Sequence, residues 1–310
     1  MFRNALLRTR PKALAHAQYA VLALALAAVL TSAPSQNALA ANGAANPSES
    51  QSMILATTTS VRDSGLLDAL LPAFTRSTGI QVQVIAVGTG AALRMGREGN
   101  ADALLTHAPR AEQVLLEDGI ARRRTPFMQN YFVIAGPRTD PAGVMNAASP
   151  EVAIQAIDKQ GARWISRADD SGTHKRETSL FRAAGLDPEA KRKGLSRTGS
   201  GMGHSLQVAG ERRAYILSDI GTFLAFRERV DLVALSKPAP SLLNIYSVLQ
   251  LDSDRFDRPL KAEAAEAFES YLLSIEVQQQ ISTFGLDRFG QTLFTPLHLP
   301  EKASPSEQEG

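Results

Sequence analysis

Apolar and polar positions follow two different periods along most of this chain. Residues Ile80 to Val87 alternate as in a half-buried strand, whereas the apolar residues between Leu66 and Phe74 recur at steps of three and four, as on one face of a helix. Short apolar runs and helix-period segments take turns between about residues 52 and 298. This alternation predicts an α/β fold of βαβ units, with mostly parallel sheets flanked by helices.

Two interruptions of this pattern, at Gly136–Gly143 and Lys237–Pro240, predict a division into two lobes. We interpret residues 52–137 and 240–298 as lobe 1 and residues 138–239 as an inserted lobe 2. The chain then crosses between the lobes twice, which makes a hinge, and ligands favour such domain interfaces. The other predicted strands are Met53–Ala56, Ala101–Leu105, Tyr131–Ala135, Trp164–Ser166, Ala214–Leu217 and Leu232–Leu235.

The first 40 residues have the composition of a secretory leader. They contain basic but no acidic residues, an apolar run from Val21 to Leu30, and the small-residue cleavage site Ala38–Ala40. The apolar run is about half of the ~20 residues that span a bilayer. Residues 1–40 are therefore predicted to be a signal peptide rather than a membrane anchor, and the protein is expected to be periplasmic. Residues 41–51 predict a flexible linker and residues 299–310 a disordered tail, because both are small and polar.

Charge and cysteine content exclude several classes of function. The chain carries 33 Lys plus Arg against 31 Asp plus Glu, and removing the four basic residues of the leader leaves 29 against 31, a formal charge of −2. The chain without its leader therefore lacks the clustered basic residues of a nucleic-acid-binding protein. The tight run Arg122–Arg124 is predicted to be a solvated loop. The absence of cysteine excludes disulfides, thiolate metal sites and cysteine nucleophiles.

Three short polar segments each follow a predicted strand and open a predicted helix: residues 56–60 (ATTTS), 87–90 (VGTG) and 167–174 (RADDSGTH). In open α/β sheets the loops at the carboxyl ends of strands converge on the ligand site. Hydroxyls and unpaired N–H groups at helix starts, with Arg167 beside them, suit a small oxyanion held without water. The three segments together predict an anion receptor.

Each segment taken alone also has a simpler explanation. Ser60 and Asp63 have the spacing of a capping box, and Thr89 between two glycines is compatible with a plain turn. Arg167 has aspartates beside it for a purely structural ion pair. The segment Gly199–Gly203 predicts a flexible connection ahead of a helix, and whether it or Thr222 contacts a ligand stays open at this point.

Catalytic and metal-binding alternatives have weaker support. Asp170, Ser171 and His174 are the residue types of acyl transfer, but a serine and a histidine three apart at a helix start lack the required geometry, and the Gly-x-Ser-x-Gly motif is absent. A secreted serine hydrolase is therefore the less favoured alternative. His107, His174 and His204 lack the spacing of a metal motif and are predicted to be ordinary polar histidines.

These segments resemble those of the tungstate-binding receptors of ABC-type importers, in the type II periplasmic binding protein superfamily. The likeness runs from about Ile54 to Phe294. It is carried by residues 55–67 (LATTTSVRDSGLL), 84–90 (VIAVGTG), 107–109 (HAP), 166–175 (SRADDSGTHK), 199–203 (GSGMG) and 219–226 (DIGTFLAF). The Arg-x-x-x-Ser-Gly-Thr pattern that begins at Arg167 is also similar to that of the phosphate receptors of this superfamily, which place a carboxylate at the position of His107.

The resemblance implies a non-enzymatic, cofactor-free, monomeric receptor of two lobes that closes on one tetrahedral oxyanion and delivers it to a membrane permease and its ATPase. Tungstate is the expected ligand, and molybdate or another tetrahedral oxyanion such as phosphate is the alternative. A buried carboxylate accepts a hydrogen bond from protonated phosphate and repels an oxyanion that has no proton to donate, so a histidine at position 107 is expected to favour tungstate or molybdate. The expected ligand-binding residues are Thr58, Thr59, Ser60, Thr89, His107, Arg167, Ser171, Gly172 and Thr173.

One position departs from the pattern of the family. The segment around Arg167 often reads Ser-Arg-Gly-Asp-Asp-Ser-Gly, whereas this chain has Ala168 after the arginine. If the position requires a positive φ, alanine is strained there by about 1 kcal/mol or more. We do not expect this strain to abolish binding.

Overall fold

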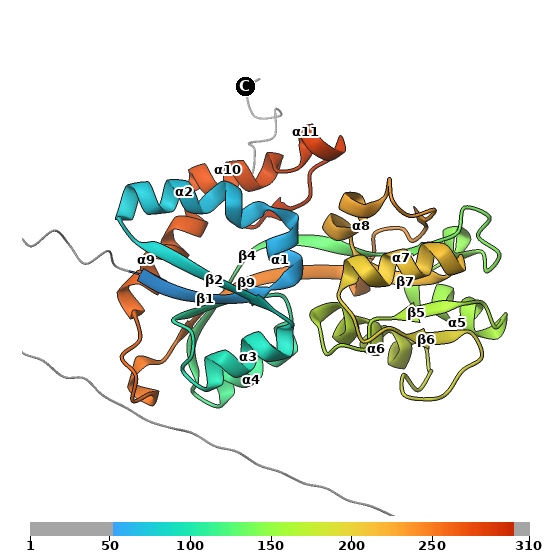
Figure 1. The fold of residues 1–310 in the computed structure, drawn as a ribbon, viewed down its shortest axis with the longest axis horizontal. Coiled ribbons are helices and arrows are strands. Elements are labelled where there is room, and N and C mark those ends of the chain that lie inside the picture. Colours follow the sequence, from blue (N-terminus) through green and yellow to red (C-terminus); the bar gives the residue numbers. More distant parts are fainter. Residues whose placement is uncertain (1–51, 301–310) are drawn as a thin grey trace, which may run out of the picture. The chain divides into compact units, whose positions relative to one another are not determined.

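Residues 52–300 are described by the structure, a computed structural model in which helices lie on both sides of a mixed sheet (Figure 1). The predicted signal peptide (1–40), the predicted linker (41–51) and residues 301–310 of the predicted tail lie outside the described residues. Across residues 52–300, every helix is too short or too polar to cross a membrane.

Ten strands of the described part form the sheet, in the order β2-β1-β3-β9-β4-β7-β5-β6, with β8 and β10 also paired to β4. Their bounds are β1 (Ser52–Thr58), β2 (Gln81–Val87), β3 (Ala103–Thr106), β4 (Ala121–Gly136), β5 (Trp164–Ser166), β6 (Leu195–Arg197), β7 (Tyr215–Asp219), β8 (Val233–Ala234), β9 (Leu243–Leu251) and β10 (Thr295–Pro296). The short strands β6 (LSR) and β10 (TP) were not among the predicted strands, because they lack the run of apolar residues that marks a strand in the sequence.

Strand pairing is parallel at the two ends of the sheet and antiparallel in its middle. β1 pairs in parallel with β2 and β3, and β5 pairs in parallel with β6 and β7. β9 is antiparallel to β3 and β4, and β4 is antiparallel to β7. The α/β class is confirmed, but the sheet is mixed rather than mostly parallel. Its antiparallel part comes from β4 and β9, the two long strands that run side by side through the middle of the fold (Figure 1).

The helices and 3-10 turns occupy the segments between the strands. Their bounds are α1 (Thr59–Ser64), α2 (Leu66–Thr78), α3 (Thr89–Arg97), α4 (Pro109–Glu117), η1 (Val144–Asn146), α5 (Pro150–Lys159), α6 (Gly172–Ala183), α7 (Met202–Arg212), α8 (Ile220–Phe226), η2 (Pro240–Leu242), η3 (Ser253–Arg255), α9 (Ala262–Leu273), α10 (Ile275–Thr283) and α11 (Leu286–Phe289). Each of the three polar segments does open a helix, namely α1, α3 or α6.

The prediction that the arginine run is a solvated loop is wrong, because Arg122–Arg124 lies within β4. Arg124 donates to the carboxylate of Glu112 at 2.7 Å, and Arg123 donates to that of Glu269 at 2.7 Å. Both carboxylates are buried, with side chains 0% and 3% exposed. A buried carboxylate needs a charged or hydrogen-bonding partner, so these arginines complete the interior rather than face only water.

β4 extends far beyond the predicted strand Tyr131–Ala135, since it begins at Ala121. Its pairing partner changes along its length: Tyr131 still pairs with β9, whereas Phe132 pairs with β7. This exchange lies ahead of the predicted lobe boundary at residue 137. The bounds assigned to the two lobes stay a prediction.

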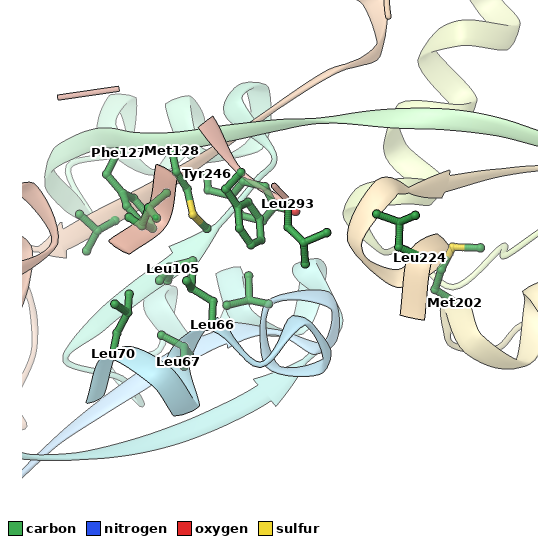
Figure 2. Close-up of a cluster of buried hydrophobic side chains, with 14 of the residues drawn as sticks. Leu66, Leu67, Leu70, Leu105, Phe127, Met128, Met202, Leu224, Tyr246 and Leu293 are labelled. Atoms are coloured by element: carbon green, nitrogen blue, oxygen red, sulfur yellow. The ribbon is translucent and has the colours of Figure 1, made fainter. Parts of the chain in front are cut away.

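The apolar face predicted for the helix at Leu66 to Phe74 is buried in the largest hydrophobic cluster. Leu66, Leu67, Leu70 and Phe74 of α2 are each at most 3% exposed. Figure 2 shows the three leucines together with Leu105 of β3, which lies in the same cluster. Burial of a leucine side chain stabilises a fold by about 1.5–3 kcal/mol. This packing holds α2 in place directly after α1, the helix whose start contains the end of the first polar segment.

Candidate anion-binding site

The structure brings the starts of α3 and α6 into direct contact, although they are far apart in the sequence. The backbone N–H of Gly172, at the start of α6, donates to the Oγ1 of Thr89, at the start of α3, at 2.7 Å. A Cβ atom on Gly172 would lie 2.7 Å from Cε1 of His107, so the histidine ring lies against the same helix start. Both Thr89 and His107 are buried. The second and third polar segments therefore meet at His107.

The first polar segment begins a helix two residues earlier than the capping box implied. Thr58, not Ser60, is the N-cap of α1, and its Oγ1 accepts from the backbone N–H of Val61 at 3.4 Å. Asp63 instead pairs with the neighbouring Arg62. The capping box of Ser60 and Asp63 is therefore wrong, and the hydroxyl of Ser60 is free of that role. Thr59 is half-buried beside it.

His107 connects the first polar segment to the two long strands. Its Nε2 lies 3.1 Å from the Oγ of Ser60, and its Nδ1 lies 2.9 Å from the Oδ1 of Asn244. The amide nitrogen of Asn244 donates to Asn130 and to the hydroxyl of Tyr246, each at 2.9 Å. Asn244 thus presents its oxygen to the ring, so Nδ1 carries the proton and Nε2 accepts from the Ser60 hydroxyl. Both ring nitrogens are engaged, which makes His107 a support for Ser60.

The pKa of His107 is lowered to about 4, chiefly by burial and also by the positive charges of Arg167 and Arg176, against the hydrogen bond to Asn244, which raises it. The ring is therefore neutral at pH 7. It also stacks on Tyr246, with ring centroids 4.8 Å apart. A neutral, fixed imidazole keeps the Ser60 hydroxyl in one orientation without adding charge to the site.

Arg167 is a buried cation whose Nε donor is unused among the described residues. Arg167 directly follows β5 and is 3% exposed. Its guanidinium donates to the carboxylate of Asp169 at 2.5 Å and to the Oγ1 of Thr173 at 3.4 Å. The structural Arg–Asp pair that was the alternative explanation does form. The Nε atom nevertheless has no hydrogen-bond partner among the described residues. Because buried donors are almost always satisfied, an unpaired Nε next to a helix start indicates a place for an acceptor.

The start of α6 combines a side-chain cap with first-turn backbone donors. Ser171 is the N-cap, and its Oγ accepts from the backbone N–H of His174 at 3.2 Å. Thr173 is buried, with 1% exposure, and its hydroxyl faces Arg167. The first-turn N–H groups of a helix have no intrahelical acceptor, and the helix dipole places partial positive charge there.

The loop between Arg167 and Ser171 has two residues with left-handed backbone. Ala168 has φ 48° and Asp170 has φ 55°. The positive φ considered for Ala168 from the sequence is thus present. Asp tolerates this region better than alanine, so the strain falls on Ala168.

We expect Ala168→Gly to stabilise the protein by about 0.5–1 kcal/mol, because relief of the left-handed strain exceeds the added freedom of the unfolded chain. Urea unfolding measures the free energy of unfolding. Ala183→Gly, in the last turn of α6, is the control and is expected to destabilise by about 0.5–1 kcal/mol. A destabilising Ala168→Gly would contradict the inferred strain.

The geometry of the serine hydrolase alternative is not present. The Oγ of Ser171 accepts from the backbone of His174, not from its imidazole. The imidazole Nδ1 accepts from the backbone N–H of Asp170 at 3.2 Å. A nucleophile needs a hydrogen bond to the base that activates it, and Ser171 has none here. Within residues 52–300, no cluster of three or more His, Cys, Asp or Glu side chains is arranged for a metal ion.

Sequence reasoning missed the polar residues of the long strands and of β7. Asn130, Asn244 and Tyr246 lie in β4 and β9, two strands that are mostly apolar around them and that show no motif at these positions. Asp219 ends β7 and caps α8, and its Oδ1 accepts from the backbone N–H and the hydroxyl of Thr222. The hydroxyl of Thr222 therefore serves this cap. The motif DIGTF at residues 219–223, an aspartate followed three residues later by a threonine, is the signal from which this cap could have been found.

The segment Gly199–Gly203 leads into α7, as predicted, and Gly201 is the N-cap of that helix. A Cβ on Gly201 would have no atom within 4 Å. The surroundings of Gly201 thus differ from those of Gly172, where a Cβ would meet two site residues.

Comparison with known proteins identifies close relatives over most of the chain. The sequence matches the PBP superfamily domain over residues 37–276. It is 41% identical over 247 residues to the tungstate-binding protein TupA of Peptoclostridium acidaminophilum, covering 79% of this chain and 85% of that protein. The solved structure of the tungstate-binding protein TupA from Desulfovibrio alaskensis G20 matches with a TM-score of 0.71 at 37% identity, covering 80% of this chain and 100% of that one. The solved structure described as the tungstate ABC transporter from Geobacter sulfurreducens matches with a TM-score of 0.68 at 39% identity, covering 75% of this chain and 98% of that one.

Proposed function

Because the chain belongs to the PBP superfamily, in the family of the tungstate-binding proteins, we propose that it is a receptor that binds tungstate at the starts of α1, α3 and α6. It acts by binding, without a cofactor and without catalysis. Arg167 supplies the positive charge in this proposal, and the other contacts come from Thr58, Thr59, Ser60, Thr89, Ser171, Gly172 and Thr173.

The observation that carries the proposal is the unpaired Nε of the buried Arg167. A buried guanidinium with a free Nε donor suits an anionic acceptor, which forms a stronger hydrogen bond than a neutral one. Thr173 adds a buried hydroxyl, and Thr89 lies opposite at the start of α3. Tungstate carries four oxygens and no proton at neutral pH, so donors from several directions match its shape and charge.

Calorimetric titration of the mature protein, residues 41–310, with tungstate, molybdate, sulfate and phosphate tests this proposal. We expect saturable one-to-one binding, with tungstate tightest. Preference for molybdate, sulfate or phosphate would overturn the assignment of tungstate and keep the receptor. Absence of binding to all four anions would overturn the receptor itself.

We further propose that the protein works in the periplasm as a monomer and delivers its ligand to a membrane permease and the ATPase of that permease. Support comes from the ABC-transporter description of the Geobacter sulfurreducens protein and from the predicted signal peptide. Capture by a mobile receptor and release at the membrane requires an anion site that closes and opens, as hinged lobes allow.

Gly172→Ala is expected to weaken oxyanion binding by about 1–3 kcal/mol, since an added methyl group in a packed contact forces its neighbours apart. The Cβ would lie 2.7 Å from Cε1 of His107 and 3.1 Å from the Oγ1 of Thr89. The approach of α6 to these two residues would therefore be lost, and with it the alignment of the donors. Calorimetry with tungstate measures the change in affinity.

Gly201→Ala is the matched control, because Gly201 also stands at a helix start but has open space at its Cβ position. The control is expected to bind with the affinity of the wild type. Equal affinity of Gly172→Ala and the wild type would show that close contact between α6 and Thr89 is not needed for binding.

A further inference from the structure

A pocket of about 320 Å³ lies between the first turn of α4 and one face of α6. Arg110 contributes to it from α4, and Lys175, Arg176 and Arg182 contribute from α6. All four of these residues are basic, and no carboxylate lines the pocket. The proposed contacts to tungstate do not include any of them.

The positive charge of this pocket is only partly compensated. Arg110 and Arg182 are exposed, and neither takes part in an ion pair with another residue of the range 52–300. Lys175 pairs with Asp170 at the rim. Glu112, on α4, does not line the pocket, and its carboxylate is engaged by Arg124, the hydroxyl of Thr106 and the backbone N–H of Ala108.

Arg176 is fixed in the pocket by neutral partners. Its guanidinium donates to the backbone carbonyls of Ser241 at 3.2 Å and Leu243 at 2.8 Å, and it lies over the ring of Phe132. Burial lowers its pKa, and the charge of Arg110 lowers it further. Carbonyls and an aromatic ring orient this cation without neutralising it, so its field remains available to an anion.

The pocket adjoins the proposed tungstate site. His107 and Gly172 line the pocket, and the same two residues contact the site: His107 bonds to Ser60, and Gly172 bonds to Thr89. By contrast, Thr58, Arg167 and Thr173 are each at most 3% exposed. The pocket and the proposed site thus share His107 and Gly172, and the pocket offers an anion from solvent a place next to the buried donors.

We propose that Arg110, Lys175, Arg176 and Arg182 form an anion vestibule that collects the oxyanion from solvent and speeds its association with the buried site. The inference rests on the proposed function and adds to it a second set of residues that govern the rate of capture. A cleft lined by charge of one sign concentrates counter-ions and raises association rates by about 10- to 1,000-fold. Since these residues stay outside the closed site, they affect association much more than dissociation.

The test replaces the two exposed arginines, Arg110→Gln with Arg182→Gln, and measures stopped-flow association with tungstate through the fluorescence of the single tryptophan, Trp164. At low ionic strength the association rate constant is expected to fall about tenfold, with the dissociation rate constant unchanged. Calorimetry is then expected to show Kd higher by the same factor. The difference should shrink as salt is added towards 1 M, where the Debye length is about 3 Å.

The matched control is the double variant Arg76→Gln with Arg138→Gln, which removes the same charge from exposed positions outside the pocket. It is expected to associate at nearly the rate of the wild type. Equal association rates for the two double variants, or a change confined to dissociation, would overturn the vestibule while leaving the proposed function intact. Absence of tungstate binding by the wild type would overturn both.

Discussion

Replacing Arg167 by alanine is expected to weaken tungstate binding by about 2–4 kcal/mol, which is about 30- to 1,000-fold in Kd. The guanidinium is buried, and its Nε is unpaired within the described residues, so its removal takes a charged donor from the proposed site. The change also leaves Asp169 without its partner, which adds an uncompensated negative charge near the anion. Calorimetric titration of both proteins measures the loss.

Arg197→Ala is the matched control for this prediction. Arg197 ends β6, the parallel neighbour of β5, but it is exposed and bonds to the backbone of Pro188. It is expected to leave affinity unchanged. Arg167→Lys retains a positive charge without the planar fork and is expected to bind with intermediate affinity. Wild-type affinity in a folded Arg167→Ala variant, checked by its thermal unfolding, would remove Arg167 from the site.

The features that could be predicted from the sequence depend on residues close together in the chain. A hydroxyl-rich or glycine-rich turn after a strand predicts a helix start, and α1, α3 and α6 do begin at such turns. Arg167 and Thr173 are six residues apart and meet across one loop. The composition of these segments was therefore enough to place the proposed donors at helix starts. The family resemblance added His107 and the expected ligand.

The supports of these donors could not be predicted, because they depend on contacts between distant residues. Asn130 and Asn244 face each other only because β4 and β9 pair in that register, 114 residues apart in sequence. Their bond orients Asn244 towards His107, and His107 in turn orients Ser60. In an apolar strand pattern a single asparagine gives no sign of its partner.

The same limit explains the error at Arg122–Arg124. A run of three basic residues is usually solvated, and only the fold reveals that Glu112 and Glu269 are buried next to it. The charge pattern along the chain thus predicted an exposed loop, whereas strand pairing with β9 required an extended segment. Tertiary pairing decided the outcome over local composition.

His107 and Glu177 are buried and have opposite pKa shifts, so their contributions to the pH dependence of the unfolding free energy are expected to cancel. Burial lowers the pKa of His107 to about 4, so below its ordinary value of 6.5 the unfolded chain binds more protons than the folded one, and stability falls as pH falls from 6.5 to 4. Burial raises the pKa of Glu177 to about 7, against the bonds and charges of Ser166, Arg167 and Arg197, so stability falls as pH rises from 4.5 to 7. Each effect amounts to about 3 kcal/mol. Between pH 4.5 and 6.5 the two therefore nearly cancel.

Glu177→Gln and His107→Asn separate the two effects when urea unfolding is followed from pH 4 to 7. Relative to Glu177→Gln, the wild type is expected to lose about 3 kcal/mol of unfolding free energy between pH 4.5 and 7. Relative to His107→Asn, it is expected to lose about 3 kcal/mol between pH 6.5 and 4. Asp219, whose pKa burial also raises, is present in all three proteins and cancels in these differences. The unfolding free energy of the wild type and of either variant could instead change in parallel with pH. The replaced group would then titrate alike in the folded and unfolded chain, and the interior around His107 or Glu177 would have to admit water.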